Sequence, residues 1–384
     1  MKTAPPVTSA STAQPATPPA RVMRVTMTTV AKRAEVSLMT VSLSLRDDPR
    51  IPPATRQRIK RLATQLGYRP DPAVSQFMNR LRHSRFSEPA PVAWLTTHRT
   101  KSGWRENAAN TAFFDGATRR AKELGFRLDE FWLHETGMNE HRMSDILLAR
   151  GIRGVLVAPL FEPGKIADLG WERLAAVACG SYSLVNPNLH RACTHHAHAV
   201  KMAWEGLTRC GYRRIGLVIA DHHNRRTGGQ WLASLLLQQH SLPPGSPDRI
   251  EPFVAADDDY NAAGVLRWYR RARPDVVLSF GPTREWLMEG GVRVPEQCGF
   301  ARVDQMESGV AHVDEHRPAV GAAAFDLVVE QLNNHQFGLP AQPKTVLIEC
   351  NWHDGPTAPG PRQTRNHRSA HAKSLCITQA AGET

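Results

Sequence analysis

The sequence lacks cysteines in close pairs. Its cysteines are scattered, and none has a neighbour at the short spacing of a zinc site or a redox motif. They are Cys179, Cys193, Cys210, Cys298, Cys350 and Cys376. This pattern indicates reduced thiols in a cytosolic protein.

Long apolar segments are also missing. The N-terminal stretch MKTAPPVTSASTAQPATPPA contains one lysine but lacks the apolar core of a signal peptide. No later window is apolar for long enough to span a bilayer. The sequence therefore predicts a protein that is neither exported nor inserted into a membrane.

Signatures of catalysis are absent as well. The sequence has no nucleophile elbow, no glycine-rich loop for phosphate groups and no paired-carboxylate signature. We therefore predict that the protein is not an enzyme and uses no cofactor. The histidines at 195–198 and His222-His223 have spacings that a metal ion can use, but no cysteine or carboxylate lies nearby at ligand spacing. A metal site is thus not predicted, and a pH-responsive contact stays open as an alternative.

The sequence does concentrate positive charge near its N-terminus. The formal net charge is +12, and residues 21–85 hold fourteen Lys or Arg against four Asp or Glu, a net charge of +10. A small basic segment joined to an almost neutral body is typical of a polyanion-binding module, because neutralising phosphates requires a high local charge density. A solvated helical surface is the alternative explanation.

Changes in composition divide the chain into five segments. Residues 1–24 are rich in Pro, Ala, Ser and Thr, which predicts a disordered tail. Residues 25–70 carry helical signals, and residues 71–90 resemble a linker that contains one short amphipathic helix. Residues 91–354 alternate apolar strands with amphipathic helices. Residues 355–384 are again polar and Pro-rich, which predicts a second disordered tail.

The basic segment predicts three short helices. They cover residues 30–34, 38–45 and 54–68. Ser37 is placed to cap the second helix, and Gly67 ends the third as a C′ glycine does.

The body predicts an α/β fold. Its repeated order of strand, helix and strand favours two parallel sheets, each wound on both faces as in a Rossmann fold. We expect one subdomain from residues 91–194 with 312–336, and the other from residues 195–311 with 340–354. Ligand sites in such folds lie at the carboxyl ends of the strands.

Residues 25–74 carry a recognisable pattern, formed by Val30-Ala31, Ala34, Val36-Ser37, Thr40-Val41-Ser42, Thr55-Arg56, Ile59 and the closing Leu66-Gly67-Tyr68-Arg69-Pro70. This pattern resembles the DNA-binding head of the LacI/GalR family of bacterial transcription regulators. A lone helix-turn-helix pattern is weak, but a run of this length with correct spacing is specific. The stretches ILLARGIRGVLVAP and GLTRCGYRRIGLVI resemble the family's effector domain, a relative of the type I periplasmic binding proteins.

The resemblance implies a cytoplasmic, nucleoid-associated homodimer whose two heads bind a roughly palindromic double-stranded operator. It further implies that a small ligand, a sugar or a sugar derivative, binds in the cleft of the body and changes the posture of the heads. The expected function is a transcription regulator that acts as a repressor. The alternative is a cytosolic sugar-binding or sugar-processing protein whose basic head binds nucleic acid without sequence preference.

Several head residues correspond to DNA contacts of that family. Small hydroxyl residues that face phosphates correspond to Thr26, Ser37, Thr40 and Ser42. Further predicted contacts come from Arg46, Arg50, Arg56 and Tyr68. These side chains are expected to set the register of the head on the DNA backbone.

The base-reading positions depart from the family's common pattern. They hold Leu38, Met39 and Leu43, and Leu43 replaces a common arginine. Apolar side chains contact thymine methyl groups but cannot donate paired hydrogen bonds to guanine, which predicts a weaker or AT-biased reader. In the alternative, Leu43 turns into the core. The resemblance also places Phe77 as an apolar wedge in the minor groove, with packing against the body or a partner hinge as the alternative.

Five residues are candidates for the ligand cleft. Arg226 and Asp304 correspond to the family's charged contacts to ligand. Trp104, Trp132 and Trp231 are candidates for an aromatic plate against a sugar ring, with a place in the core as the alternative for each.

Overall fold

The computed structural model describes residues 25–68, 89–160, 163–166, 168–256, 258–304 and 309–360. The chain divides into two compact units, Met1–Phe86 and Ser87–Thr384, called the head and the body below. The predicted tail at 1–24, residues 71–88 of the predicted hinge with Phe77, and residues 361–384 lie outside the described residues.

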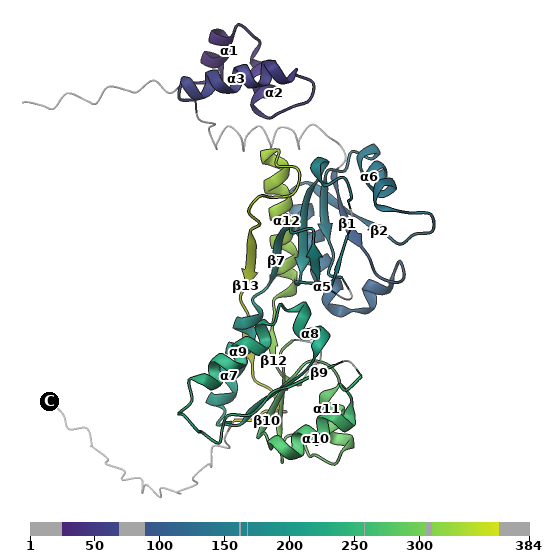
Figure 1. Ribbon diagram of the computed structural model, residues 1–384, viewed down its shortest axis with the longest axis vertical. Helices are drawn as coiled ribbons and strands as arrows, with labels where there is room; N and C mark the ends of the chain where they lie inside the picture. Colours follow the sequence, from purple (N-terminus) through teal and green to yellow (C-terminus); the bar gives the residue numbers. More distant parts are fainter. Residues whose placement is uncertain are drawn as a thin grey trace, which may run out of the picture. The chain divides into compact units, whose positions relative to one another are not determined.

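The described part of the head contains the helices α1 (Met27–Ala34), α2 (Leu38–Leu45) and α3 (Pro53–Gln65) (Figure 1). Ser37 caps α2 as predicted, because its Oγ accepts a hydrogen bond from the Thr40 amide at 3.1 Å. All three helices contribute to a small apolar core, which includes Val30, Val41 and Ile59. The head therefore depends on short local signals and one shared core.

The first sheet of the body is parallel throughout, in the order β13-β7-β5-β3-β1-β2. Its strands are β1 (Ala90–Thr96), β2 (Phe126–Trp132), β3 (Gly154–Val157), β5 (Ala175–Gly180), β7 (His190–Thr194) and β13 (Thr345–Ile348). Its helices are α5 (Ala108–Glu123), α6 (Glu140–Ala149) and α12 (Arg317–Asn334).

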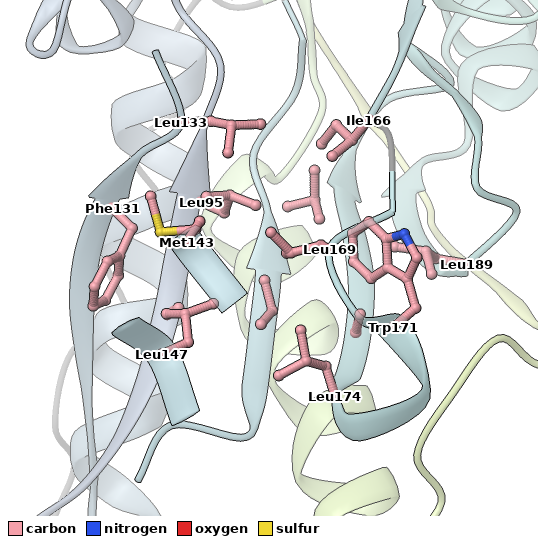
Figure 2. Close-up of a cluster of buried hydrophobic side chains, with 14 of the residues drawn as sticks. Leu95, Phe131, Leu133, Met143, Leu147, Ile166, Leu169, Trp171, Leu174 and Leu189 are labelled. Carbon is pink, nitrogen blue, oxygen red and sulfur yellow. The ribbon is translucent and has the colours of Figure 1, made fainter. Parts of the chain in front are cut away.

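Both faces of this sheet are buried, as a parallel sheet requires. Along β1, Leu95 packs on one face with Met143 and Leu147 of α6, as Figure 2 shows. Its neighbour Trp94 packs on the other face, in a cluster that includes Phe325 of α12. This alternation follows from the two-residue period of a strand, and it gives each helix layer its own apolar surface.

The second sheet has the order β14-β12-β11-β10-β8-β9 and is parallel except for the edge strand β14. Its strands are β8 (Ile215–Ala220), β9 (Phe253–Ala255), β10 (Val276–Ser279), β11 (Gly299–Arg302), β12 (Ala311–Asp314) and β14 (Asn351–His353). The helix α7 (His196–Arg209) leads from β7 of the first sheet into β8, and the helices that follow strands of the second sheet are α8 (Asp221–Arg226), α9 (Gln230–His240), α10 (Ala262–Ala272) and α11 (Thr283–Glu289). Short elements complete the body: β4 (Gly164–Lys165) with β6 (Leu184–Asn186), and the 3-10 turns η1 (Gly103–Glu106) and η2 (Trp171–Arg173). In the part of the chain that is described, no helix combines the length and apolarity needed to cross a membrane.

These elements confirm the predicted fold class, a helical head and two doubly wound parallel sheets. The predicted division of the body is wrong at two strands. β12 extends the second sheet beside β11 although residues 312–336 were assigned to the first subdomain, and β13 pairs with β7 although residues 340–354 were assigned to the second. Apolar periodicity identifies a strand but does not show which sheet the strand joins. The sequence therefore did not show that the chain passes between the two sheets at β12 and β13, the two crossings.

The prediction of a disordered tail from residue 355 is also wrong for its first residues. The Thr357 carbonyl accepts from the Phe300 amide at 2.8 Å, and Thr357 Oγ1 accepts from the Ala311 amide at 3.0 Å. Ala358 is buried in the core of the second sheet. The polar, Pro-rich composition of this stretch gave no indication of these contacts.

Two glycines let α5 and α12 approach closely. A Cβ on Gly116 of α5 would lie 1.9 Å from the Pro318 carbonyl oxygen, and one on Gly321 of α12 would lie 1.9 Å from that of Phe113. Any side chain at either position would separate the helices. The contact holds the N-terminal turn of α12 beside α5, which positions the first residues of α12 for the site described next.

Candidate functional sites

The outward face of α2 is apolar. Leu38 is 48% exposed and Met39 is 67% exposed. Leu43 is half-buried and lies outside the head core, whose α2 members are Val41 and, more peripherally, Leu45. Since residues four apart share one face of a helix, Leu43 lies beside Met39 on the side opposite Val41. The structure therefore does not place Leu43 in the core.

The predicted hydroxyl contacts are partly occupied by helix caps. Thr26 Oγ1 accepts from the Thr29 amide at 3.3 Å at the start of α1, and Ser37 caps α2. Ser37 Oγ also lies 2.8 Å from Thr40 Oγ1. Ser42 Oγ accepts from Arg46 Nη2 at 2.7 Å. Thr26 and Ser37 are exposed, so capping is compatible with a phosphate contact at either helix start.

The predicted arginines bind the loop between α2 and α3. Arg50 donates to both carboxylate oxygens of Asp48, at 2.9 and 2.8 Å, and this hydrogen bonding raises the pKa of Arg50. Arg56 donates to the Asp47 carbonyl at 2.6 Å. Tyr68 packs against the head core. The sequence prediction missed the pairing with Asp48, which offsets the charge that Arg50 would present to a phosphate.

A cleft in the body lies at the carboxyl ends of strands from both sheets, where parallel α/β folds bind ligands. Its lining from the first sheet and its helices includes Asn107, Ala109, Asn110, Phe113, Pro159, Gly180, Ser181 and Thr194. The remaining lining residues are His196, His223, Arg226, Thr227, Trp231, Phe280, Asp304, Glu315 and Arg317.

Three of the five predicted ligand residues line this cleft, namely Arg226, Trp231 and Asp304. The other two do not. Trp104 is buried in the core with its ring centroid 6.0 Å from that of Trp94. Trp132 donates from Nε1 to the His98 carbonyl at 2.7 Å and is not part of the lining. A tryptophan at a strand end or in a short turn looks alike in sequence whether it faces a cleft or a core.

Buried ion pairs form one wall of the cleft. Asp304 receives hydrogen bonds from Arg302 Nε and Arg317 Nη2, both at 3.1 Å. Glu315 receives two from Arg317, at 2.9 and 2.7 Å. All four residues are less than a tenth exposed. Arg317 therefore connects the first turn of α12 with the end of β11, which belongs to the other sheet.

The electrostatics of this wall are set by burial and by these pairs. Burial raises the pKa of Asp304 against the opposing charges of Arg317 and Arg302. Burial also acts to raise the pKa of Glu315, but Arg317 and His196 together lower it below its usual value. Burial lowers the pKa of Arg226, and the like charge of Arg317 lowers it further.

The histidine cluster separates into two roles. His195 Nδ1 accepts from the His198 amide at 2.9 Å, and His198 Nδ1 accepts from the Cys350 amide at 3.1 Å, so both have structural partners. His196 instead lines the cleft, with Nδ1 3.7 Å from Glu315 Oε1. Among the described residues, no group of three His, Cys, Asp or Glu side chains has the arrangement of a metal site. The sequence marked His196 only as part of a histidine cluster and gave no ligand role to Glu315 or Arg317. In the structure, His196 and Arg317 begin helices and Glu315 directly follows β12.

The comparison with known proteins identifies the head. Residues 26–71 match the family model for bacterial regulatory proteins of the lacI family. Over these residues the head is similar to that family. The match confirms the resemblance seen in the sequence. A comparison with curated protein sequences gave no match.

Solved structures of LacI-family and related regulators share the fold. The transcriptional regulator CelR in complex with cellobiose is 17% identical with a TM-score of 0.52, over 87% of this chain and 100% of its own. The lac repressor dimer bound to operator and the anti-inducer ONPF is 16% identical with a TM-score of 0.51, over 88% and 100%. A transcription-regulator-like protein from Staphylococcus haemolyticus is 12% identical with a TM-score of 0.52, over 71% and 99%. At these identities the likeness establishes the fold.

The ion-pair wall generates a stability prediction. Replacing Arg317 with Leu leaves Asp304 and Glu315 buried without their shared donor, so we expect a loss of about 3–5 kcal/mol in the free energy of unfolding. The matched control is Arg120→Leu, because Arg120 also bridges two carboxylates, Glu123 and Asp326, but is partly exposed. That control should lose less than about 1 kcal/mol. Urea unfolding of the full chain measures both, and equal losses would contradict a special role for the buried wall.

Proposed function

We propose that the protein is a DNA-binding transcription regulator, acting as a homodimeric repressor, in which a small polar ligand in the body cleft controls operator binding. The observation that carries this proposal is the exposed face of α2 in a LacI-family head. The exposed side chains of Leu38 and Met39 contribute nothing to the head core. Adjacent exposed apolar side chains suit a helix that contacts base edges in a DNA groove.

Known relatives support the two halves of the proposal. The lac repressor structure contains operator, and the CelR structure contains cellobiose. Both share the fold of this chain, so operator DNA and a carbohydrate are the ligands we propose for the head and the cleft. Dimerisation is proposed on the same ground, because the lac repressor structure is a dimer. Phe77 remains the proposed minor-groove wedge.

The chemistry of α2 favours contacts with thymine. Leu38, Met39 and Leu43 supply apolar surface on one side of the helix, which suits the C5-methyl group of thymine in the major groove. Register then comes from the exposed hydroxyl residues at the helix starts. We propose that sequence choice by this head is AT-biased and that its affinity depends strongly on salt.

Footprinting on the upstream region of the protein's own gene tests the proposed function. We expect ligand-free protein to protect a discrete, roughly palindromic site. Analytical ultracentrifugation of the same protein should show a dimer. Salt-sensitive binding without a protected site would instead favour the alternative, a cytosolic sugar-binding or sugar-processing protein with nonspecific nucleic-acid affinity. A monomer at micromolar concentration would contradict the dimer.

The orientation of Leu43 gives a second prediction. Leu43→Arg should keep the head folded and add preference for guanine at one position of each half-site, because a paired arginine–guanine contact gives about 1–3 kcal/mol of discrimination. Gln57→Arg is the charge-matched control, since Gln57 is exposed on α3. It should tighten binding without changing the consensus. Selection from randomised DNA measures both, and an unchanged consensus for Leu43→Arg would show that Leu43 does not face the bases.

A further inference from the structure

The cleft contains buried polar atoms that have no hydrogen-bond partner among the described residues. They are Thr194 Oγ1, both ring nitrogens of His196, and Trp231 Nε1. Each of these residues is at least nine-tenths buried and lines the cleft. Unsatisfied buried polar groups are costly, so their presence at one site indicates that a ligand satisfies them. Trp231 Nε1 can only donate, and it therefore requires an acceptor.

The carboxylates of the cleft already accept hydrogen bonds within the protein. Both oxygens of Asp304 accept from arginines, and Glu315 Oε2 accepts two hydrogen bonds from Arg317. Glu315 Oε1 lies 3.7 Å from His196 Nδ1. A neutral sugar offers hydroxyl donors as well as acceptors, but the strongest acceptors here are held in ion pairs. Among the unpartnered groups that remain for a ligand, Trp231 Nε1 can only donate, whereas Thr194 Oγ1 and the His196 ring can donate or accept.

Positive charge at the cleft exceeds negative charge. Arg302 and Arg317 share Asp304 and Glu315, whereas Arg226 has no carboxylate within ion-pair distance among the described residues. Arg191 is not part of the lining, but its guanidinium donates at 2.5 Å to the carbonyl of the lining residue Ser181 and at 3.0 Å to that of Leu184. Carbonyl groups do not cancel its charge. Two guanidinium charges are therefore left without a carboxylate partner.

Helix dipoles add to the positive electrostatic potential of the cleft. The helices α5, α7, α9 and α12 all begin with residues that line the cleft or directly precede them, and none has an acidic residue in its first turn. The N-terminus of a helix carries a partial positive charge, which favours an anion. These helix N-termini act together with the unpartnered donors, the occupied carboxylates and the surplus of guanidinium charge. All four features favour a ligand that carries an anionic group.

We propose that the effector is an acidic carbohydrate, whose carboxylate or phosphate binds Arg226 and the free donors Trp231 Nε1 and Thr194 Oγ1. This inference rests on the proposed function, because it assigns the chemical class of the ligand in the same cleft. The apolar surfaces of Phe113 and Phe280 in the lining then contact the carbon skeleton of the sugar. The anion neutralises guanidinium charge that the protein itself leaves unpaired.

Thermal unfolding of the full-length chain with matched ligands tests the inference. The panel consists of glucose, glucuronate and glucose 6-phosphate, and of galactose, galacturonate and galactose 6-phosphate, at equal concentration and ionic strength. We expect at least one acid to raise the melting temperature while its neutral partner does not, because binding to the folded state stabilises it by mass action. The carboxylate and phosphate arms identify which anion is bound. Neutral sugars that act as strongly as the acids, or acids without effect, would overturn the inference.

Two neighbouring arginines provide the matched variants. Arg226→Gln should weaken the binding of the active acid by about tenfold to a hundredfold, as expected for loss of a charged hydrogen-bond donor. Arg225→Gln removes the same charge from the adjacent residue, which is exposed, pairs with Asp221 and lies outside the cleft lining. It should retain wild-type affinity, and equal losses in the two variants would refute a specific contact with Arg226. Footprinting of ligand-free protein is independent of this result, so failure of the inference and failure of the proposed function are distinguishable.

Discussion

The Arg317 guanidinium, held between two buried carboxylates, is the interaction on which the body depends. Its partner Asp304 follows a strand of the second sheet, while Arg317 itself begins the long helix that covers the first sheet. A charge removed from water is tolerated only when its hydrogen bonds are satisfied, and here one guanidinium donates to both carboxylates while Arg302 donates to the second oxygen of Asp304. The bridge therefore fixes the place where the chain passes from one sheet to the other, and the same groups form a wall of the cleft.

This arrangement has a chemical consequence for the cleft. Because the acidic groups are bound internally, the polar surface left to a ligand includes the Trp231 Nε1 donor and the Arg226 guanidinium, beside the apolar rings of Phe113 and Phe280. In the head, the carboxylates of the loop after α2 pair with basic side chains, Asp48 with Arg50 and Asp47 with Lys60. The exposed face of α2 is apolar. The two units thus offer different surfaces, one on which we propose a small anion binds and one which we propose contacts thymine methyl groups.

Local features of this fold were predictable from sequence, because local residues produce them. The Ser37 cap, the three head helices and the alternation of strands with helices follow from signals a few residues apart. The crossings at β12 and β13 were not predictable, since a strand's period is the same in either sheet. Trp104 and Trp231 show the same limit at single residues, because only the tertiary fold decides that one lies in a core and the other lines a cleft. Arg226 and Asp304 came from family resemblance, whereas His196, Glu315 and Arg317 required the geometry.

We propose above all that a ligand bound in the body cleft changes the affinity of the head for DNA. This proposal is tested most directly by fluorescence anisotropy of the footprinted DNA site, titrated with full-length protein that is either ligand-free or saturated with the acid that raises its melting temperature. The account predicts that the Kd for DNA differs between the two states by at least about fivefold, the lower range of allosteric coupling. The same Kd in both states, at a ligand concentration shown to saturate the cleft, would contradict it.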